Sequence, residues 1–317
     1  MVISLILIVV GFAGLIFGAN WLVDGASSLA KKYNIPDLVI GLTIVAFGTS
    51  APELVVNSVA SVDGLSDIVL ANIIGSNNFN LFIILGIAGL IYPITVHSSM
   101  VRKEIPISLI IVVILFALAN DFFMSENAVI SRFDGIILLV CFFGFLFYLF
   151  KNMKAEQPNE IPYVQKSNTK IWGLIIIGLS GLIIGGKLVV DNSIGIATDL
   201  GVSQKIIGLT IIAAGTSLPE LITSIVAALK KNSDIAIGNV IGSNIFNILL
   251  ILSISSLISP IKYNEIFNQD IAILIGGTAF LLIAMFTGKK KKLDRWEALI
   301  LISFYLIYTI YLVSKEL

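Results

Sequence analysis

A long internal repeat constrains the fold of this chain more than any other feature of its sequence. Residues 40–80 align without a gap on residues 207–247, an offset of 167 residues, and 24 of the 41 aligned positions are identical. The same offset aligns residues 11–18 with 178–185, Asp24 with Asp191, and Pro93 with Pro260. The matching residues are largely Gly, Thr, Ser, Pro, Glu and Asn, so chance similarity between two apolar segments does not explain them. The chain is therefore built from two copies of one unit.

The composition places both copies in a lipid bilayer. Hydrophobic residues make up 57% of the 317 residues and charged residues only 13%, with a mean hydropathy of +1.01. A soluble protein has about 25% charged residues, so soluble enzymes and nucleic-acid-binding proteins are excluded. Apolar runs long enough to span a bilayer predict ten helices, near residues 3–30, 36–60, 67–91, 104–119, 133–150, 170–198, 204–229, 234–258, 269–287 and 296–313.

The loops between these ten segments differ strongly in basic residues. Successive loops alternate between the two sides of the membrane, and one side holds 15 Lys and Arg against 4 on the other, with Lys187 inside a span. Cytoplasmic loops are rich in Lys and Arg, so the basic side is predicted to be cytoplasmic and both termini extracellular. Five spans in residues 1–151 and five in residues 169–317 are predicted to flank a short cytoplasmic linker, 152–168.

An odd number of spans per copy means that the second copy runs through the membrane upside down. The sequence thus predicts an all-α polytopic membrane protein, with ten transmembrane helices arranged as two inverted five-helix repeats. Inverted repeats are typical of secondary transporters, in which the binding site lies at the junction of the repeats and access alternates. A channel can also be duplicated, so the pattern favours a transporter.

Each copy carries a Gly-Thr-Ser-x-Pro-Glu motif inside a predicted span, at residues 48–53 and 215–220. Proline removes a backbone donor and clashes with the carbonyl four residues before it, so spans 2 and 7 are predicted to break there. The breaks are expected to leave carbonyls without helical partners at about Ala46–Thr49 and Ala213–Thr216. Such groups are tolerated in a membrane only inside protein or beside a water-filled cavity, and a cation can satisfy them.

Glu53 and Glu220 follow these breaks directly. An ionisable side chain at the centre of a span costs about 2.5–3.5 kcal/mol on insertion scales, and such residues usually mark an ion pathway. A basic partner could neutralise them instead, but Lys187 is the sole basic residue away from the helix ends and cannot pair with both. We therefore expect both carboxylates to bind a transported ion.

Spans 3 and 8 carry a matching polar set: Asn72, Gly75, Ser76, Asn77 and Asn80 in the first copy, and Asn239, Gly242, Ser243, Asn244 and Asn247 in the second. Ser76 and Asn80 are four residues apart and share one helix face, as do Ser243 and Asn247. We expect these four side chains to face the site. For the other four asparagines, hydrogen bonding between helices explains their presence as well as a role in the site does.

The potential ligand atoms in these motifs are all oxygens. Oxygen ligands suit hard cations, and Ca²⁺ takes 6–8 of them, whereas transition metals favour His or Cys. The chain has one residue of each kind, Cys141 in an apolar run and His97 in a polar loop. One Ca²⁺ or two Na⁺ would neutralise two ionised glutamates, and a third Na⁺ would leave the loaded site with one net positive charge. The ligand set is therefore compatible with electrogenic exchange. No cofactor and no enzyme activity are expected.

In GTSAPE with GSNNFN, and GTSLPE with GSNIFN, the chain resembles the cation/calcium exchanger superfamily, specifically its sodium/calcium exchanger branch. The resemblance covers the whole chain. It implies that Glu53 and Glu220 bind Ca²⁺ centrally and share in Na⁺ binding, and that the carbonyls of Thr49 and Thr216 add Ca²⁺ ligands. Asn80 and Asn247 match the remaining central positions.

The resemblance also implies two mirrored Na⁺ sites and a transport movement. One Na⁺ site is formed by Ala46, Ser50 and Ser76, and its mirror by Ala213, Ser217 and Ser243. In this family spans 1 and 6 slide across the other eight to switch access. The glycine-rich stretches at 11–18 and 178–186 fit a smooth sliding surface.

Two departures from the family narrow the expected function. Asn247 stands where some potassium-dependent relatives have aspartate, which weakens a K⁺-coupled function, and the linker 152–168 is too short for the Ca²⁺-sensing domain of animal exchangers. The expectation is a Na⁺/Ca²⁺ antiporter of the cell membrane that works by alternating access. Its partners are inorganic cations and the lipid bilayer, with no nucleic acid and no obligate protein partner. H⁺- or K⁺-coupled Ca²⁺ exchange and, as a different class, a cation channel stay open as alternatives.

Overall fold

The computed structural model describes residues 2–96, 100–121, 128–151, 166–201, 213–287 and 291–316, and it is nearly all helical. Its first eight helices are α1 (Val2–Tyr33), α2 (Asp37–Ile40), α3 (Ala46–Thr49), α4 (Ala51–Val62), α5 (Ser66–Phe79), α6 (Leu85–Ile91), α7 (Ile105–Ala119) and α8 (Arg132–Lys151). The others are α9 (Asn168–Asp199), α11 (Ala213–Gly215), α12 (Leu218–Leu229), α13 (Ser233–Phe246), α14 (Leu252–Ile258), α15 (Asn268–Ala284) and α16 (Arg295–Glu316).

Several of these helices are joined by π-helical turns, which the sequence did not predict. They span Gly41–Val45, Asn80–Ile84, Met100–Glu104 and Asn247–Ile251, and a 3-10 turn, Glu265–Phe267, precedes α15. Two of the four begin at the predicted site residues Asn80 and Asn247. A π-helical turn inside an α-helix is frequent at functional sites.

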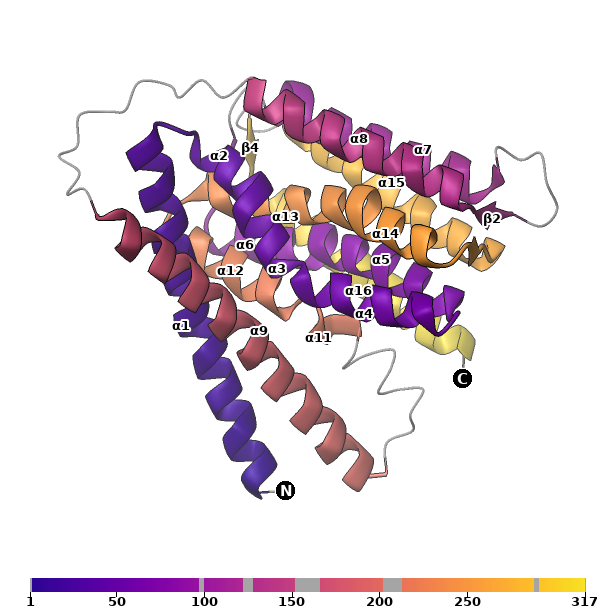
Figure 1. The fold of residues 1–317 in the computed structure, drawn as a ribbon, viewed down its shortest axis with the longest axis horizontal. Helices are drawn as coiled ribbons and strands as arrows, with labels where there is room; N and C mark the ends of the chain where they lie inside the picture. The colour runs from indigo at the N-terminus through magenta and orange to yellow at the C-terminus, as the bar shows by residue number, and fades with distance from the viewer. Residues whose placement is uncertain are drawn as a thin grey trace.

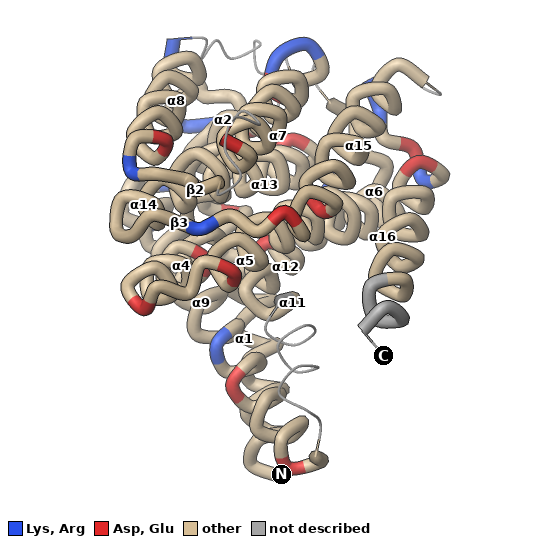
Figure 2. Tube along the Cα trace, turned by 90° about the vertical axis from the view of Figure 1, so that its right-hand side faces the viewer, with Lys and Arg blue, Asp and Glu red and all other residues tan. Residues whose placement is uncertain are grey.

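Helices occupy all or part of each of the ten predicted spans. Among the described helical segments, six are long and apolar enough to cross a membrane, and the bent pair Asp37–Thr49 and Ala51–Val62 makes a seventh. The other three predicted spans contain α7, α12 and α16. Figure 2 shows long stretches of helix that carry no charged residue. The count of ten spans stays a prediction, and His97, most of the linker 152–168 and the start of span 7 lie outside the described residues.

The two longest helices, α1 and α9, have 32 residues each and lie side by side, reaching away from the other helices (Figure 1). Glycines allow their backbones to approach closely. A Cβ added at Gly18 would lie 2.7 Å from the carbonyl oxygen of Gly178, and one at Gly185 would lie 2.6 Å from that of Gly11. A real Cβ atom does not approach another atom this closely, so α1 and α9 can pack at this distance only with glycine at these positions.

The remaining helices form a bundle around α13 and α14. The segment Ser233–Ile258, which contains both, is 94% buried over its most apolar stretch, although its composition would allow it to face lipid. Buried apolar side chains from α5, α6, α7, α8 and α15 surround it. A second apolar cluster joins α1 and α9 to α12 and to the start of α13. The central helix pair therefore positions Ser243 and Asn247 at the middle of the protein.

Two short antiparallel strand pairs close opposite ends of the bundle (Figure 1). β1 (Ile94–Thr95) pairs with β4 (Lys292–Leu293), and β2 (Val129–Ile130) pairs with β3 (Ile261–Lys262). Each pair joins residues that precede the linker to residues that follow it. The expectation of an all-α chain is wrong in this detail, because the loop ends satisfy their backbone groups by pairing across the two halves of the sequence.

Two hydrogen bonds beside these strands are equivalent under the 167-residue offset, so the same contact is made once from each copy. The amide of Thr95 donates to Ser233 Oγ at 3.3 Å, and the amide of Lys262 donates to Ser66 Oγ at 3.1 Å. A self-complementary pattern, in which the same two patches meet twice, is the mark of an approximate two-fold relation.

Two arginines, 163 residues apart, make a similar pair of contacts with helix ends that are related by the 167-residue offset. Arg132 Nε donates to the carbonyl of Leu257 at 3.1 Å, at the C-terminal end of α14. Arg295 Nε donates to the carbonyl of Leu90 at 3.0 Å, at the C-terminal end of α6. The last carbonyls of a helix lack helical partners, so each arginine caps a helix that comes from the other half of the sequence.

Removal of either cap should destabilise the protein. We expect Arg132→Met and Arg295→Met each to lower the free energy of unfolding by about 1 kcal/mol, because each removes exposed hydrogen bonds from a charged donor. Thermal unfolding of the purified protein in detergent measures this. Arg102→Met, which changes an exposed arginine of a π-helical turn, is the control, and an equal loss of stability in all three variants would contradict the capping role.

Candidate functional site

Both Gly-Thr-Ser-x-Pro-Glu motifs interrupt their helices, as predicted. α3 ends at Thr49 and α4 starts at Ala51 with a bend of 47°, while α11 ends at Gly215 and α12 starts at Leu218. The serine between each pair has almost the same backbone conformation, with φ −83° and ψ 7° at Ser50 and φ −89° and ψ 8° at Ser217. Each proline lies in the first turn of the new helix, where its missing N–H removes no bond that the turn needs.

The carbonyls released by the first break are not all those that the sequence predicted. The Ala46 carbonyl keeps its helical partner, the amide of Ser50 at 3.0 Å, and also accepts from Thr49 Oγ1 at 3.3 Å. Proline deprives only the carbonyl four residues before it of a donor, and for Pro52 that residue is Gly48. Because a carbonyl oxygen has two lone pairs, a cation at Ala46 has to displace the Thr49 hydroxyl.

The two glutamates are buried, each 1% exposed, and each is bound by the serine of the other copy. Ser50 Oγ donates to Glu220 Oε1 at 2.9 Å, and Ser217 Oγ donates to Glu53 Oε1 at 3.3 Å. Ser243 Oγ lies 3.4 Å from the same Glu220 oxygen. The two broken helices therefore meet at their carboxylates, and these bonds bring five of the predicted residues together: Glu53, Glu220, Ser50, Ser217 and Ser243.

Five oxygens of this cluster are buried and have no hydrogen-bond partner. They are Glu53 Oε2, Glu220 Oε2, Asn80 Oδ1, Asn247 Oδ1 and Ser76 Oγ. A buried acceptor left unsatisfied costs about 1–3 kcal/mol, and more where it carries charge. Within the described residues, no group of three or more His, Cys, Asp or Glu side chains could hold a metal. The cluster of carboxylate, amide and hydroxyl oxygens thus fits a hard cation.

Asn77 of α5 and Asn244 of α13 hold these two helices together. Asn77 Nδ2 donates to the Asn244 carbonyl at 3.3 Å, and Asn244 Nδ2 donates to the Asn77 carbonyl at 3.2 Å. Their side-chain oxygens accept from Asn80 Nδ2 at 3.1 Å and from Asn247 Nδ2 at 2.9 Å. Of the two roles that the sequence left open, hydrogen bonding between helices is the one seen here, and it orients the side-chain amides of Asn80 and Asn247.

Asn72 and Asn239 instead contact the threonines of the breaks. Asn72 Nδ2 lies 3.3 Å from Thr216 Oγ1, and Thr49 Oγ1 donates to Asn239 Oδ1 at 3.0 Å. Each amide therefore supports the broken helix of the other copy.

Sequence reasoning missed Asn57 and Ser224, which are fully buried behind these amides. Asn57 Nδ2 donates to Asn72 Oδ1 at 2.7 Å, and Ser224 Oγ accepts from Asn239 Nδ2 at 3.0 Å. Their position four residues after each glutamate, on the same helix face, is the signal that could have found them.

The remaining predicted residues are placed as follows. Ala46, Thr49 and Ser217 are buried, Thr216 is half-buried, and Ala213 begins α11. Lys187 is exposed on α9. That the twelve predicted residues bind cations stays a prediction.

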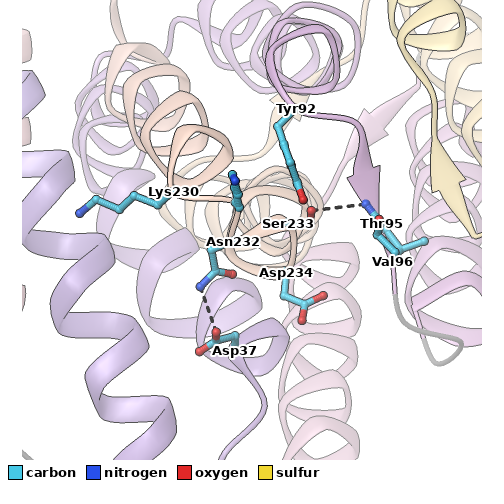
Figure 3. Close-up of a pocket in the computed structure, with 9 residues that line it drawn as sticks. Asp37, Tyr92, Thr95, Val96, Lys230, Asn232, Ser233 and Asp234 are labelled. Carbon is cyan, nitrogen blue, oxygen red and sulfur yellow. Dashed lines mark hydrogen bonds between the residues drawn. The ribbon is translucent and has the colours of Figure 1, made fainter. Parts of the chain in front are cut away.

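A separate polar cavity of about 460 Å³ lies at the start of α13, and none of the predicted ligands lines it. Figure 3 shows Asp37, Asn232 and Asp234 at this cavity, with the dashed bond from Asn232 Nδ2 to Asp37 Oδ2, which measures 2.9 Å. Lys230 points away from these residues (Figure 3) and pairs with Asp24 of α1 at 2.8 Å. The cavity is thus lined by polar groups of loops and helix ends.

Comparison with known proteins gives a consistent result. The family model described as "Sodium/calcium exchanger protein" matches residues 3–151 and 170–314. The putative antiporter CaxA of Alkalimonas amylolytica is 36% identical over 99% of this chain and 100% of its own length. The sodium/calcium exchanger MaX1 of Methanosarcina acetivorans is 31% identical over 98% of both chains.

Solved structures of the sodium-calcium exchanger NCX_Mj have the same fold. The structure soaked with zero Na⁺ and Ca²⁺ superposes with a TM-score of 0.85 and 33% identity, over 98% of this chain and 100% of that one. The match of sequence and fold covers both halves of the chain. The chain is a member of the sodium/calcium exchanger family.

Proposed function

We propose that this protein is a secondary antiporter that exchanges Na⁺ for Ca²⁺ through one central site. The observation that carries the proposal is the set of five unpartnered, buried oxygens on Glu53, Glu220, Ser76, Asn80 and Asn247. The family membership and the similarity to MaX1, a sodium/calcium exchanger, support the same ions. The ions are the cargo of the protein, so neither is a resident cofactor.

Shared ligands account for the coupling between the two ions. Two ionised carboxylates buried without a counter-ion are costly, so the protein changes access only when either Ca²⁺ or Na⁺ neutralises them. Both ions use the same glutamate oxygens and therefore exclude each other. Exchange of three Na⁺ for one Ca²⁺ moves one net charge per cycle, worth about 2.3 kcal/mol per 100 mV of membrane potential.

Alternating access requires two states related by the inverted repeat. The reciprocal contacts of the strand pairs and arginine caps support two halves that run oppositely through the membrane. In the proposed cycle α1 and α9 slide as a pair across the bundle, and their glycine contact keeps the two helices together. The basic loops face the cytoplasm, both termini are extracellular, and the protein lies in the cell membrane.

Transport by the purified protein in lipid vesicles tests this function. Vesicles loaded with Na⁺ and diluted into Na⁺-free medium should take up ⁴⁵Ca²⁺, and an inside-positive potential should change the rate if net charge moves. Separate vesicles with only a pH gradient or only a K⁺ gradient test the alternative coupling ions. Ca²⁺ flux that needs no counter-ion gradient and does not saturate would indicate a channel and contradict the proposal.

A further inference from the structure

The two copies of the repeat differ at a position directly behind the cation site. Asn57 of α4 corresponds to Ser224 of α12 by the 167-residue offset, and both are fully buried. Each contacts the asparagine that supports a broken helix, Asn72 in one case and Asn239 in the other. The asparagine, threonine and glutamate of the two networks are identical in the two copies, so among the residues that form these hydrogen bonds only this position differs.

In the first copy, a backbone group determines how the amides are oriented. Asn57 Nδ2 donates at 2.7 Å to the carbonyl of Glu53, which can only accept. The same Nδ2 is 2.7 Å from the side chain of Asn72, so Asn72 must present its oxygen there. Asn72 consequently turns its NH₂ group toward Thr216 Oγ1, 3.3 Å away.

The second copy has the opposite arrangement. Asn239 Nδ2 itself donates to the Glu220 carbonyl at 3.3 Å and to Ser224 Oγ at 3.0 Å. This leaves Asn239 Oδ1 to accept from Thr49 Oγ1 at 3.0 Å. Thus Asn239 accepts a hydrogen bond from Thr49, whereas Asn72 donates a hydrogen bond to Thr216.

This reversal makes the two threonine hydroxyls unequal. Thr49 gives its proton to Asn239 and only secondarily, at 3.3 Å, to the Ala46 carbonyl. Thr216 already accepts from Asn72, and we infer that its own proton is directed to the carbonyl three residues before it, that of Ala213, as Thr49 Oγ1 donates to the carbonyl of Ala46. A carbonyl that accepts a full hydrogen bond is a poorer cation ligand than one that shares it.

We propose that Asn57 is a positioning residue that makes the two mirrored Na⁺ positions unequal, weakening the position at Ala213 relative to the one at Ala46. The inference rests on the proposed function, because it assigns those positions to Na⁺. Ca²⁺ is held mainly by the carboxylates and is affected less. Asn57 thereby contributes to the relative affinities for the two ions without touching either.

The stability of the folded protein does not by itself explain why residue 57 is an asparagine. Asn57 Oδ1 is buried and has no hydrogen-bond partner, whereas Ser224 Oγ has one. A serine at position 57 could accept from Asn72 Nδ2, which could then also donate to the Glu53 carbonyl, as Asn239 Nδ2 does to Ser224 and the Glu220 carbonyl in the second copy. We therefore expect Asn57→Ser to keep or raise the melting temperature while it changes ion binding.

The test measures Na⁺ binding directly. The melting temperature of the detergent-purified protein is recorded against Na⁺ concentration, since a ligand that binds the folded state raises it. Asn57→Ser and Asn57→Thr should both lower the half-saturating Na⁺ concentration about threefold to tenfold, the range of one neutral hydrogen bond. The half-saturating Ca²⁺ concentration should change less than the Na⁺ value.

The mirror variant provides the matched control. Ser224→Asn should raise the half-saturating Na⁺ concentration, and the double variant N57S/S224N should return it toward the wild-type value. If Ser224→Asn does not fold, the inference is tested by Asn57→Ser and Asn57→Thr alone, which should both lower the half-saturating Na⁺ concentration. Unchanged Na⁺ binding in both, or equal losses of Na⁺ affinity, Ca²⁺ affinity and melting temperature, would overturn the inference.

The same measurements separate this inference from the proposed function. Wild-type protein that binds Na⁺ but does not exchange it for Ca²⁺ in vesicles contradicts the function, and the binding results for Asn57 still decide the inference. Wild-type protein that does not bind Na⁺ at all contradicts both.

Discussion

Replacement of Glu53 or Glu220 by glutamine should reduce Na⁺-driven Ca²⁺ uptake at least about 100-fold, equivalent to about 2.7 kcal/mol. In the proposed site each carboxylate supplies half of the negative charge that offsets the dehydration of Ca²⁺, and at ligand distance one unit charge is worth more than this in a buried site. Both variants should remain folded, because each removes a buried charge whose second oxygen has no hydrogen-bond partner. Uptake of ⁴⁵Ca²⁺ into Na⁺-loaded vesicles and the melting temperature are measured together.

Glu104→Gln is the matched control for these variants. Glu104 is also buried, at 4% exposure, and also has one oxygen without a partner, but it accepts from the Tyr148 hydroxyl at 2.9 Å at the start of α7, outside the cation site. This variant should transport Ca²⁺ at the wild-type rate. Equal loss of transport in all three variants would mean that burial of the carboxylate matters and not its place in the site.

Alanine at Gly18 or Gly185 should lower the uptake rate at least about tenfold and destabilise the protein by about 1–3 kcal/mol, the usual cost of overpacking. The added methyl groups would meet backbone atoms of the partner helix at 2.7 and 2.6 Å. Neither helix can relieve this by a change of rotamer, so α1 and α9 must separate. The proposed sliding of the pair then loses its close contact, which initial rates of uptake and thermal unfolding would both report.

A third glycine of the same helix pair distinguishes contact from helix propensity. A Cβ at Gly173 of α9 would have no atom within 4 Å. Gly173→Ala should therefore stabilise the helix by about 0.5–1 kcal/mol and leave uptake unchanged. If Gly173→Ala slows transport as much as Gly185→Ala, the close contact between α1 and α9 is not the cause.

Much of the fold and of the candidate site could be predicted because the signals are local. A proline and a glycine inside an apolar run interrupt a helix wherever they occur in the chain, and both breaks lie at their motifs. Glu53 and Glu220, expected to face the interior of the protein because each lies inside such a run, are buried, whereas Lys187 is exposed on α9. The repeat offset also predicted which residues would have equivalent environments, because equivalent sequences fold alike.

The pairing of these residues was decided only by the tertiary structure. Ser50 binds Glu220 and Ser217 binds Glu53, pairs that lie 170 and 164 residues apart. The sequence could not tell which asparagines form hydrogen bonds between helices and which support the broken helices. A side-chain amide can do either, and its neighbours come from the other copy. The same holds for the reversal at Asn57. Composition and motif chemistry are properties of single segments, whereas the direction of each hydrogen bond depends on which two segments meet.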